Sequence, residues 1–200
     1  MIEESFNPND KSNVIAVADF EIDNQDTFHL KKLYEMIHEW FMDHDYKSPS
    51  KVAVPEHIES LYFQKNMEGG LMEHVIWWRP QKIPDNNPYL KFFFHIDFQT
   101  IAMSASKVEF KGHTMKTNKG EVVIRCKSYI ILDYKNEWKK SKFLKLFHNR
   151  FKNVWYKKTI EFYKNQLFAE TYDLQSIIKQ YLTLKNPHEL QKPFHPEKGL

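Results

Sequence analysis

The chain has 200 residues, of which 42% are hydrophobic and 16% aromatic, so the composition excludes a disordered polymer and fits one domain with its own core. The only cysteine, Cys126, excludes an internal disulfide framework, and we therefore expect a reducing, cytoplasmic compartment. The N-terminal residues form no apolar segment and no stretch approaches the ~20 apolar residues of a spanning helix, so we expect neither a signal peptide nor a transmembrane segment.

The net charge of +3 conceals a strong asymmetry along the chain. Residues 1–60 contain five basic and 13 acidic residues, whereas residues 135–200 contain 14 basic and six acidic ones. Only three of the 29 basic residues are arginines. A charge bias that separates along the chain indicates an oppositely charged partner more directly than the total charge does.

The first quarter of the chain predicts an arm, a strand and an acidic helix. Residues 1–13 are polar and predict a loose arm, and residues 14–22 predict a strand because they are rich in β-branched residues. Residues 23–27 offer several N-caps for an amphipathic helix predicted over residues 28–46, where apolar residues recur at i, i+3, i+4 and i+7. The outer face and C-terminal end of this helix carry Glu35, Glu39, Asp43 and Asp45.

Five further strands are predicted, over residues 56–66, 71–79, 89–102, 107–115 and 121–133. A proline-containing linker over residues 47–55 precedes them, and a glycine-containing turn joins the first two into a hairpin. The third strand is the clearest, because apolar and polar residues alternate along it. Residues 116–120 predict another hairpin turn, with Gly120 in a left-handed conformation.

The C-terminal part of the chain predicts helix. After Tyr134 the pattern is helical without Pro or Gly as far as Lys185, and either one bent helix or two consecutive helices would fit it. Glu170 interrupts the apolar spacing of its second half, and residues 187–200 predict a proline-containing tail. We therefore expect one α+β domain over residues 14–186. It would be a mostly antiparallel sheet of five to six strands, packed against the N-terminal helix and a long C-terminal helical segment, in an order that resembles helix-grip proteins.

The most distinctive segment covers residues 135–164, with ten basic residues against two acids and aromatic residues every four positions from Phe143. The candidate partner-binding residues are Lys139, Lys140, Lys142, Lys145, Arg150, Lys152, Lys157, Lys158, Phe147, Phe151 and Trp155. Three interpretations are open. The aromatic stripe could pack on the protein's own sheet, with the lysines solvated, and this sheet is the expected partner of the stripe. The segment could instead contact a nucleic acid, a ribonucleoprotein or an anionic membrane surface. It could also meet the acidic helix, with Glu35, Glu39, Asp43 and Asp45 as counter-surface, in the same chain or in another copy of an oligomer.

Motifs for chemistry are weak. His95 and Asp97 share the polar face of one predicted strand, and His113 could face them from the next, which would suit a metal or a general base. Cross-strand pairing or the lining of a cavity explains the same residues. Cys126 lies in phase with apolar neighbours and predicts a buried structural thiol. No phosphate-binding loop or paired-cysteine motif occurs, so we expect no metal, no cofactor and no catalytic residue.

Four motifs carry a resemblance: FFFHIDFQTI (92–101), KTNKGEVVIR (116–125), DYKNEWKKSKFL (133–144) and ETYDLQSIIKQYL (170–182). Together they resemble a group of uncharacterised small proteins from small-genome archaea, over residues 28–186. This resemblance implies a lineage and no activity. The residues themselves favour a non-enzymatic binding or assembly protein that uses the basic segment as its contact surface. The alternative is a carrier of a small hydrophobic ligand, with a cavity between sheet and long helix lined by Phe94 and Ile96.

Overall fold

The computed structural model describes residues 12–49, 54–110 and 113–184. The strands in these residues are β1 (Val14–Phe28), β2 (Glu59–Asn66), β3 (Met72–Trp78), β4 (Gln81–Lys82), β5 (Leu90–Phe110) and β6 (His113–Leu132). The helices are α1 (Leu30–Asp43), α2 (Glu137–Lys140), α3 (Lys142–Arg150), the π-helical η3 (Phe151–Trp155) and α4 (Lys157–Leu184), with short 3-10 turns at Glu68–Gly70 and Pro84–Asn86. The predicted tail over residues 187–200 and most of the predicted N-terminal arm lie outside the described residues.

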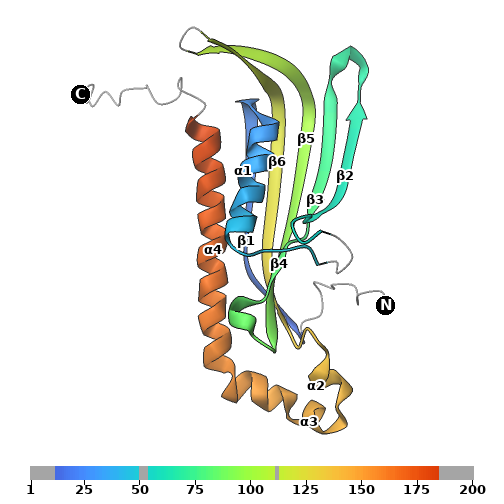
Figure 1. Ribbon diagram of the computed structural model, residues 1–200, viewed down its shortest axis with the longest axis vertical. Helices are drawn as coiled ribbons and strands as arrows, with labels where there is room; N and C mark the ends of the chain where they lie inside the picture. The colour runs from blue at the N-terminus through green and yellow to red at the C-terminus, as the bar shows by residue number, and fades with distance from the viewer. Residues whose placement is uncertain (1–11, 50–53, 111–112, 185–200) are drawn as a thin grey trace, which may run out of the picture.

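The predicted α+β class is confirmed (Figure 1). Within the described residues the strands form one antiparallel sheet in the order β1–β6–β5–β3–β2, and the short β4 pairs with β5. The helix α4 is roughly 42 Å long at 1.5 Å per residue and runs beside β1 (Figure 1). No helix of the described part combines the length and the apolar character that crossing a membrane requires.

The strand β1 is longer than predicted. Residues 23–27, predicted as helix caps, continue the ladder with β6 as far as the pair Phe28–Asn118. The helix α1 then begins at Leu30, and the imidazole of His29 caps it by accepting a hydrogen bond from the backbone N–H of Lys32 (3.3 Å). The long partner strand β6 therefore overrides the local preference of these polar residues for a cap.

The predicted hairpin turn over residues 116–120 is wrong. These residues belong to β6, and the pairs Ser104–Lys119 and Lys107–Lys116 place them within its ladder with β5. Gly120 serves a close approach instead of a turn, because a Cβ at this position would lie 2.9 Å from the Cα of Met103. The register shift between Ile101 and Ser104 pushes the β5 backbone toward Gly120 at this point.

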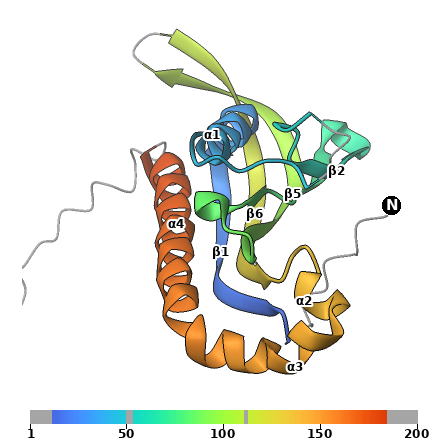
Figure 2. The same cartoon turned by 60° about the horizontal axis from the view of Figure 1, so that its bottom comes forward.

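The core lies on one face of the sheet, between the strands and the two long helices. Alternate residues of β5 from Phe92 to Thr100 point into it and are buried, as are Leu33 and Ile37 of α1. The helix α4 contributes a stripe at helical spacing, namely Ile160, Tyr163, Leu167, Leu174, Ile178 and Leu182. The opposite face of the sheet carries no helix in Figures 1 and 2.

Glu170, which interrupts the apolar spacing of α4, is a tether between α4 and the rest of the fold. Its carboxylate accepts hydrogen bonds from the Tyr46 hydroxyl (2.6 Å) and from Lys82 Nζ (3.0 Å). Burial and the neighbouring carboxylate raise the pKa of Tyr46, so the hydroxyl remains a donor. The side chains of Lys82 and Glu170 are only 16% and 13% exposed. A second tether joins Trp40 Nε1 to Asp173 (2.8 Å).

We expect Lys82→Met to lower the free energy of unfolding by about 2–4 kcal/mol, because it leaves the mostly buried Glu170 carboxylate without its cation. The double variant Lys82→Met/Glu170→Gln should lose less free energy of unfolding, because it buries no unpaired charge. The amide oxygen introduced at position 170 can still accept the hydrogen bond from the Tyr46 hydroxyl. Urea unfolding measures both variants. The control is Lys31→Met, which removes the exposed pair with Glu35 and should cost less than about 1 kcal/mol. A double variant less stable than Lys82→Met would contradict this account.

His74 is a buried titratable group on the inner face. Its backbone N–H donates to the Thr100 hydroxyl (2.9 Å), and its Nδ1 lies 2.7 Å from the same oxygen. The hydroxyl oxygen accepts from the backbone N–H, and it donates its one proton to Nδ1 in the tautomer in which that nitrogen is unprotonated. Burial lowers the pKa of His74, which favours the neutral imidazole.

A histidine whose pKa is lowered by folding binds its proton more readily in the unfolded chain. The free energy of unfolding should therefore fall as the pH drops below about 6.5, the ordinary value. We expect His74→Gln, which keeps an acceptor but does not titrate, to flatten part of this slope in urea unfolding curves. His57→Gln, which makes the same substitution at an exposed position, is the matched control for the loss of one histidine. An unchanged slope in His74→Gln would refute the assignment.

The basic aromatic elbow as candidate functional site

Residues 138–160, here called the elbow, run from the second residue of α2 through α3 and η3 into the first turn of α4, between Glu137 and Glu161. They project at the end of the molecule opposite the β5–β6 hairpin (Figure 1). The predicted single or double helix is more broken than expected. Ser141 leaves the helical conformation (φ −85°, ψ 121°), ends α2 and caps α3 through its hydroxyl, which accepts from Leu144 N–H (3.3 Å). The π-helical turn η3 then separates α3 from α4, and Figure 2 shows α3 crossing the end of the molecule before α4 turns away.

One side of the elbow is held by stacked aromatic rings, which we call the aromatic anchor: Tyr89, Trp138, His148, Phe151 and Tyr156. Trp138 stacks on Phe151 with a centroid distance of 4.4 Å and on His148 at 5.4 Å. Phe151 stacks in turn on Tyr156 at 5.1 Å. Tyr89 meets the edges of these rings and its hydroxyl lies 2.7 Å from His148 Nε2. Tyr89 directly precedes β5, so the anchor fastens the elbow to the sheet.

Two buried polar groups complete the attachment. The Asp133 carboxylate accepts from the backbone N–H groups of Trp138 (3.1 Å) and Lys139 (3.0 Å), which satisfies the start of α2. The amide of Asn87 donates to the Tyr156 hydroxyl (2.7 Å). Burial lowers the pKa of His148, which favours the neutral imidazole. The neutral ring can form a hydrogen bond with the Tyr89 hydroxyl through Nε2, as donor or acceptor according to its tautomer. The conformation of the elbow is therefore fixed by packing and hydrogen bonds together.

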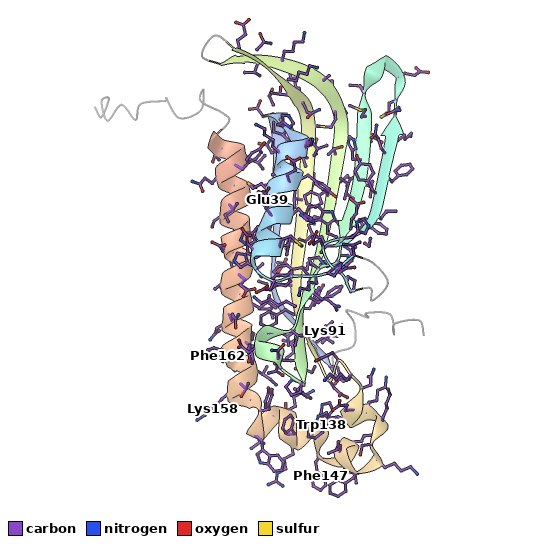
Figure 3. All side chains as sticks on the ribbon, in the orientation of Figure 1. Glu39, Lys91, Trp138, Phe147, Lys158 and Phe162 are labelled. Carbon is purple, nitrogen blue, oxygen red and sulfur yellow. The ribbon has the colours of Figure 1, made fainter. Side chains whose placement is uncertain are left out.

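The other side of the elbow is apolar and bare. Its exposed fractions are 79% for Leu146, 69% for Phe143, 63% for Val154 and Trp155, and 42% for Phe147. The expectation that this stripe packs on the protein's own sheet is therefore wrong for most of it. Of the three predicted aromatic contacts, only Phe151 is half-buried, because it stacks on Trp138 and Tyr156 and packs against the edge of the core. Figure 3 shows Phe147 pointing away from the body of the molecule.

All eight basic residues predicted as partner contacts lie in the elbow, and no acid occurs in these 23 residues. Seven of them are exposed, namely Lys139, Lys140, Lys142, Lys145, Arg150, Lys157 and Lys158. Lys152 is half-buried and its Nζ donates to the backbone carbonyl of Ser12 (2.6 Å). In the described residues the ion pairs within 4.0 Å do not involve any of the eight. Within the described residues, the cations of the elbow are therefore not neutralised by an ion pair.

The predicted acidic counter-surface on α1 does not meet the elbow within the chain. Glu35 pairs with Lys31 on its own helix (3.6 Å), and Glu39, Asp43 and Asp45 are exposed. Figure 3 shows Glu39 well separated along the long axis from Lys158 and Phe147. The intrachain form of this interpretation is therefore wrong, while pairing between two copies stays open.

The predicted polar cluster of His95, Asp97 and His113 is not assembled. His95 Nε2 lies 3.5 Å from Asp97 Oδ1, and the same oxygen accepts from Arg79 Nη2 at 2.8 Å. Burial, with the charges of Arg79 and Lys127, lowers the pKa of His95. His113 pairs with Phe110, fourteen positions along β6 from the partner of His95, or roughly 45 Å of strand. Arg79, to which no sequence pattern pointed, makes this group a cross-strand ion pair.

The remaining candidates for a catalytic, metal or ligand site are a cysteine, possible metal clusters and two surface hollows. Cys126 is buried on the inner face as predicted, and burial raises the pKa of its thiol well above the ordinary value. Among the described residues, no three His, Cys, Asp or Glu side chains gather as a metal site would require. Open hollows of about 320 and 260 Å³ border Ala16–Asp19 with Lys127–Tyr129, and Gln25 with residues 101–102 and 119–121. Neither hollow lies between the sheet and α4, where Phe94 and Leu167 are fully buried.

Comparison of the chain with protein-family models and with curated proteins gives no match.

We expect Trp138→Ala to lower the free energy of unfolding by about 2–3 kcal/mol, since the half-buried indole stacks on both Phe151 and His148. Hydrogen exchange should accelerate in residues 137–156 more than in the amides of β5 and β6. The matched control is Trp155→Ala, which removes an indole that is 63% exposed and should cost less than about 0.5 kcal/mol. Equal effects of the two substitutions would argue against an anchored elbow.

Proposed function

We propose that the protein is a non-enzymatic binding protein whose elbow contacts an acidic macromolecular surface. The observation that carries this proposal is the exposure of both parts of the elbow. Five large apolar side chains and seven cations face solvent within the same 23 residues, without an acid among them. Exposed apolar patches of this kind are uncommon on proteins unless they bind a partner. The positive charge of the elbow favours a partner that is negatively charged.

The rigidity of the elbow supports the same conclusion. The aromatic anchor holds α3 in place, so the cations are presented without a large loss of backbone freedom on binding. A single exposed ion pair contributes only about 0–1 kcal/mol, so one lysine would not define a site. Several cations against a dense array of anions act together and release counterions, which is the usual origin of binding to polyanions. The single buried thiol of Cys126 agrees with the proposed cytoplasmic location.

Two other hypotheses have less support. A carrier of a hydrophobic ligand would need a cavity against α4, but the described hollows lie elsewhere and the core side chains there are fully buried. Assembly through the acidic face of α1 in a second copy would satisfy the lysines. It would leave the exposed Leu146 and Phe143 without a matching apolar surface, because the residues Glu35, Glu39, Asp43 and Asp45 supply only charge.

The charge of the elbow can be tested with poly(U) RNA as a soluble polyanion. The variant Lys142→Gln/Lys145→Gln/Lys157→Gln/Lys158→Gln removes four exposed cations. We expect the slope of the logarithm of the binding constant against the logarithm of salt concentration to decrease by about 3, because each contact contributes about 0.7 for a single strand.

The matched control is Lys65→Gln/Lys107→Gln/Lys116→Gln/Lys127→Gln, which removes four exposed lysines outside the elbow. Both variants have the same net charge, so a difference between them reports where the cations lie. We expect the control to keep most of the salt dependence of the wild-type protein. The proposal fails if the two variants bind poly(U) equally, or if the wild-type protein binds neither poly(U) nor anionic vesicles at low salt.

A further inference from the structure

We infer that the acidic surface bound by the elbow is an anionic phospholipid bilayer, into whose interface the bare side of α3 inserts. This inference rests on the proposed function and adds the identity of the partner. The distinguishing observation is the chemical type of the exposed side chains. Leu146 at 79% and Val154 at 63% exposure are aliphatic and among the barest large apolar side chains of the elbow.

Aliphatic side chains discriminate between a lipid and a nucleic acid. Proteins that hold single-stranded nucleic acid stack bases on flat rings, and an exposed leucine or valine has no ring to offer. Duplex recognition relies heavily on Arg, and the elbow has seven lysines and only Arg150. The hydrocarbon side of a bilayer interface accepts Leu, Val and Phe equally, and surface-lying helices combine such residues with lysines.

The three sides of α3 suit a helix that lies in the plane of a membrane surface. Phe143, Leu146 and Phe147 lie at i, i+3 and i+4 and form the bare side. His148 belongs to the anchor, and the half-buried Leu144 lies four residues before it on the same side of the helix. Lys142 and Lys145 occupy the remaining side, from which their long stems can reach lipid phosphates while the apolar side is buried.

The residues at the end of α3 extend this arrangement. Arg150 follows Phe143 by seven positions and shares its face, but it stands in the last turn, where its guanidinium can reach the headgroups. Trp155 is 63% exposed in η3, and tryptophan is enriched at the level of lipid headgroups. Phe162 on the first turns of α4 is also 63% exposed and points outward (Figure 3). Peripheral attachment agrees with the lack of a spanning helix in the described residues.

The experiment is flotation of the full chain with vesicles of equal parts phosphatidylcholine and phosphatidylglycerol, with pure phosphatidylcholine vesicles for comparison. We expect binding to the anionic vesicles that weakens with salt. The variant Phe143→Ser/Leu146→Ser/Phe147→Ser should lower it about tenfold or more while leaving poly(U) binding unchanged. The matched control Phe63→Ser/Ile83→Ser/Val108→Ser changes three side chains that are 53%, 44% and 38% exposed elsewhere on the surface and should retain vesicle binding.

Tryptophan fluorescence reports directly whether the elbow inserts into the bilayer. Vesicles containing brominated phosphatidylcholine should quench and blue-shift the tryptophan emission, and this response should be lost in Trp155→Phe but kept in Trp77→Phe. Protein that binds poly(U) but no vesicles would overturn the inference and leave the proposed function intact. Protein that binds neither would overturn both. Vesicle binding that is indifferent to the three serine substitutions, or dimers that disappear with them, would show that lipid is not the partner of the apolar side.

Discussion

The stacking of Trp138 on Phe151 is the interaction on which the exposed surface of this protein depends. This stacking turns one side of the elbow toward the core and packs it against Tyr89, the residue before β5. Each ring that joins the anchor is withdrawn from solvent, and the side chains on the other sides of α3 are thereby forced outward. The same contacts that stabilise the elbow therefore determine which apolar residues stay bare.

The long helix α4 shows how a polar residue within an apolar stripe can add order. The apolar stripe from Ile160 to Leu182 packs α4 against the core. Because apolar contacts are not directional, they do not by themselves fix how far α4 is shifted along its axis relative to the sheet. Glu170 supplies a register, because its carboxylate reaches both Lys82 and Tyr46 in only one position of the helix. The hydrogen bond from Trp40 to Asp173 fixes α1 against the same helix. The direction in which α4 leaves the elbow is thus constrained by contacts near the middle of the helix.

Elements with a strong local period could be predicted from the sequence. The amphipathic spacing of α1 appears in the structure with small shifts of its ends. The alternation of β5 between Phe92 and Thr100 also appears, but the strand continues to Phe110, well beyond its predicted end at residue 102. Residues 23–27 and 116–120 were misassigned because their turn-like composition is overridden by pairing between distant strands, which no short window contains. Gly120 illustrates the ambiguity, since a glycine can permit a turn or a close approach of two backbones.

The charge of the candidate site could be predicted from the sequence, but the arrangement of its side chains could not. The concentration of eight basic residues in the elbow is visible in the sequence, because the charge of each residue is read directly from it. The exposure of the aromatic stripe could not be predicted, since Ser141 and the π-helical turn interrupt the helix and each interruption changes the angle between successive side chains. His148 and Tyr89, which are 59 positions apart in the chain, could be paired only in the folded structure.

The separation of charge along the molecule has a consequence for how it approaches any charged surface. The acids of α1 and the cations of the elbow lie at different heights on the long axis (Figure 3), so these two groups of charges contribute an electric dipole along that axis. Near a negative surface such a dipole experiences a torque that turns the elbow forward before contact. Screening limits this torque to about 8 Å at physiological ionic strength, roughly the width of one helix. Within that distance, most encounters would begin with Phe143, Leu146 and Phe147 already facing the surface.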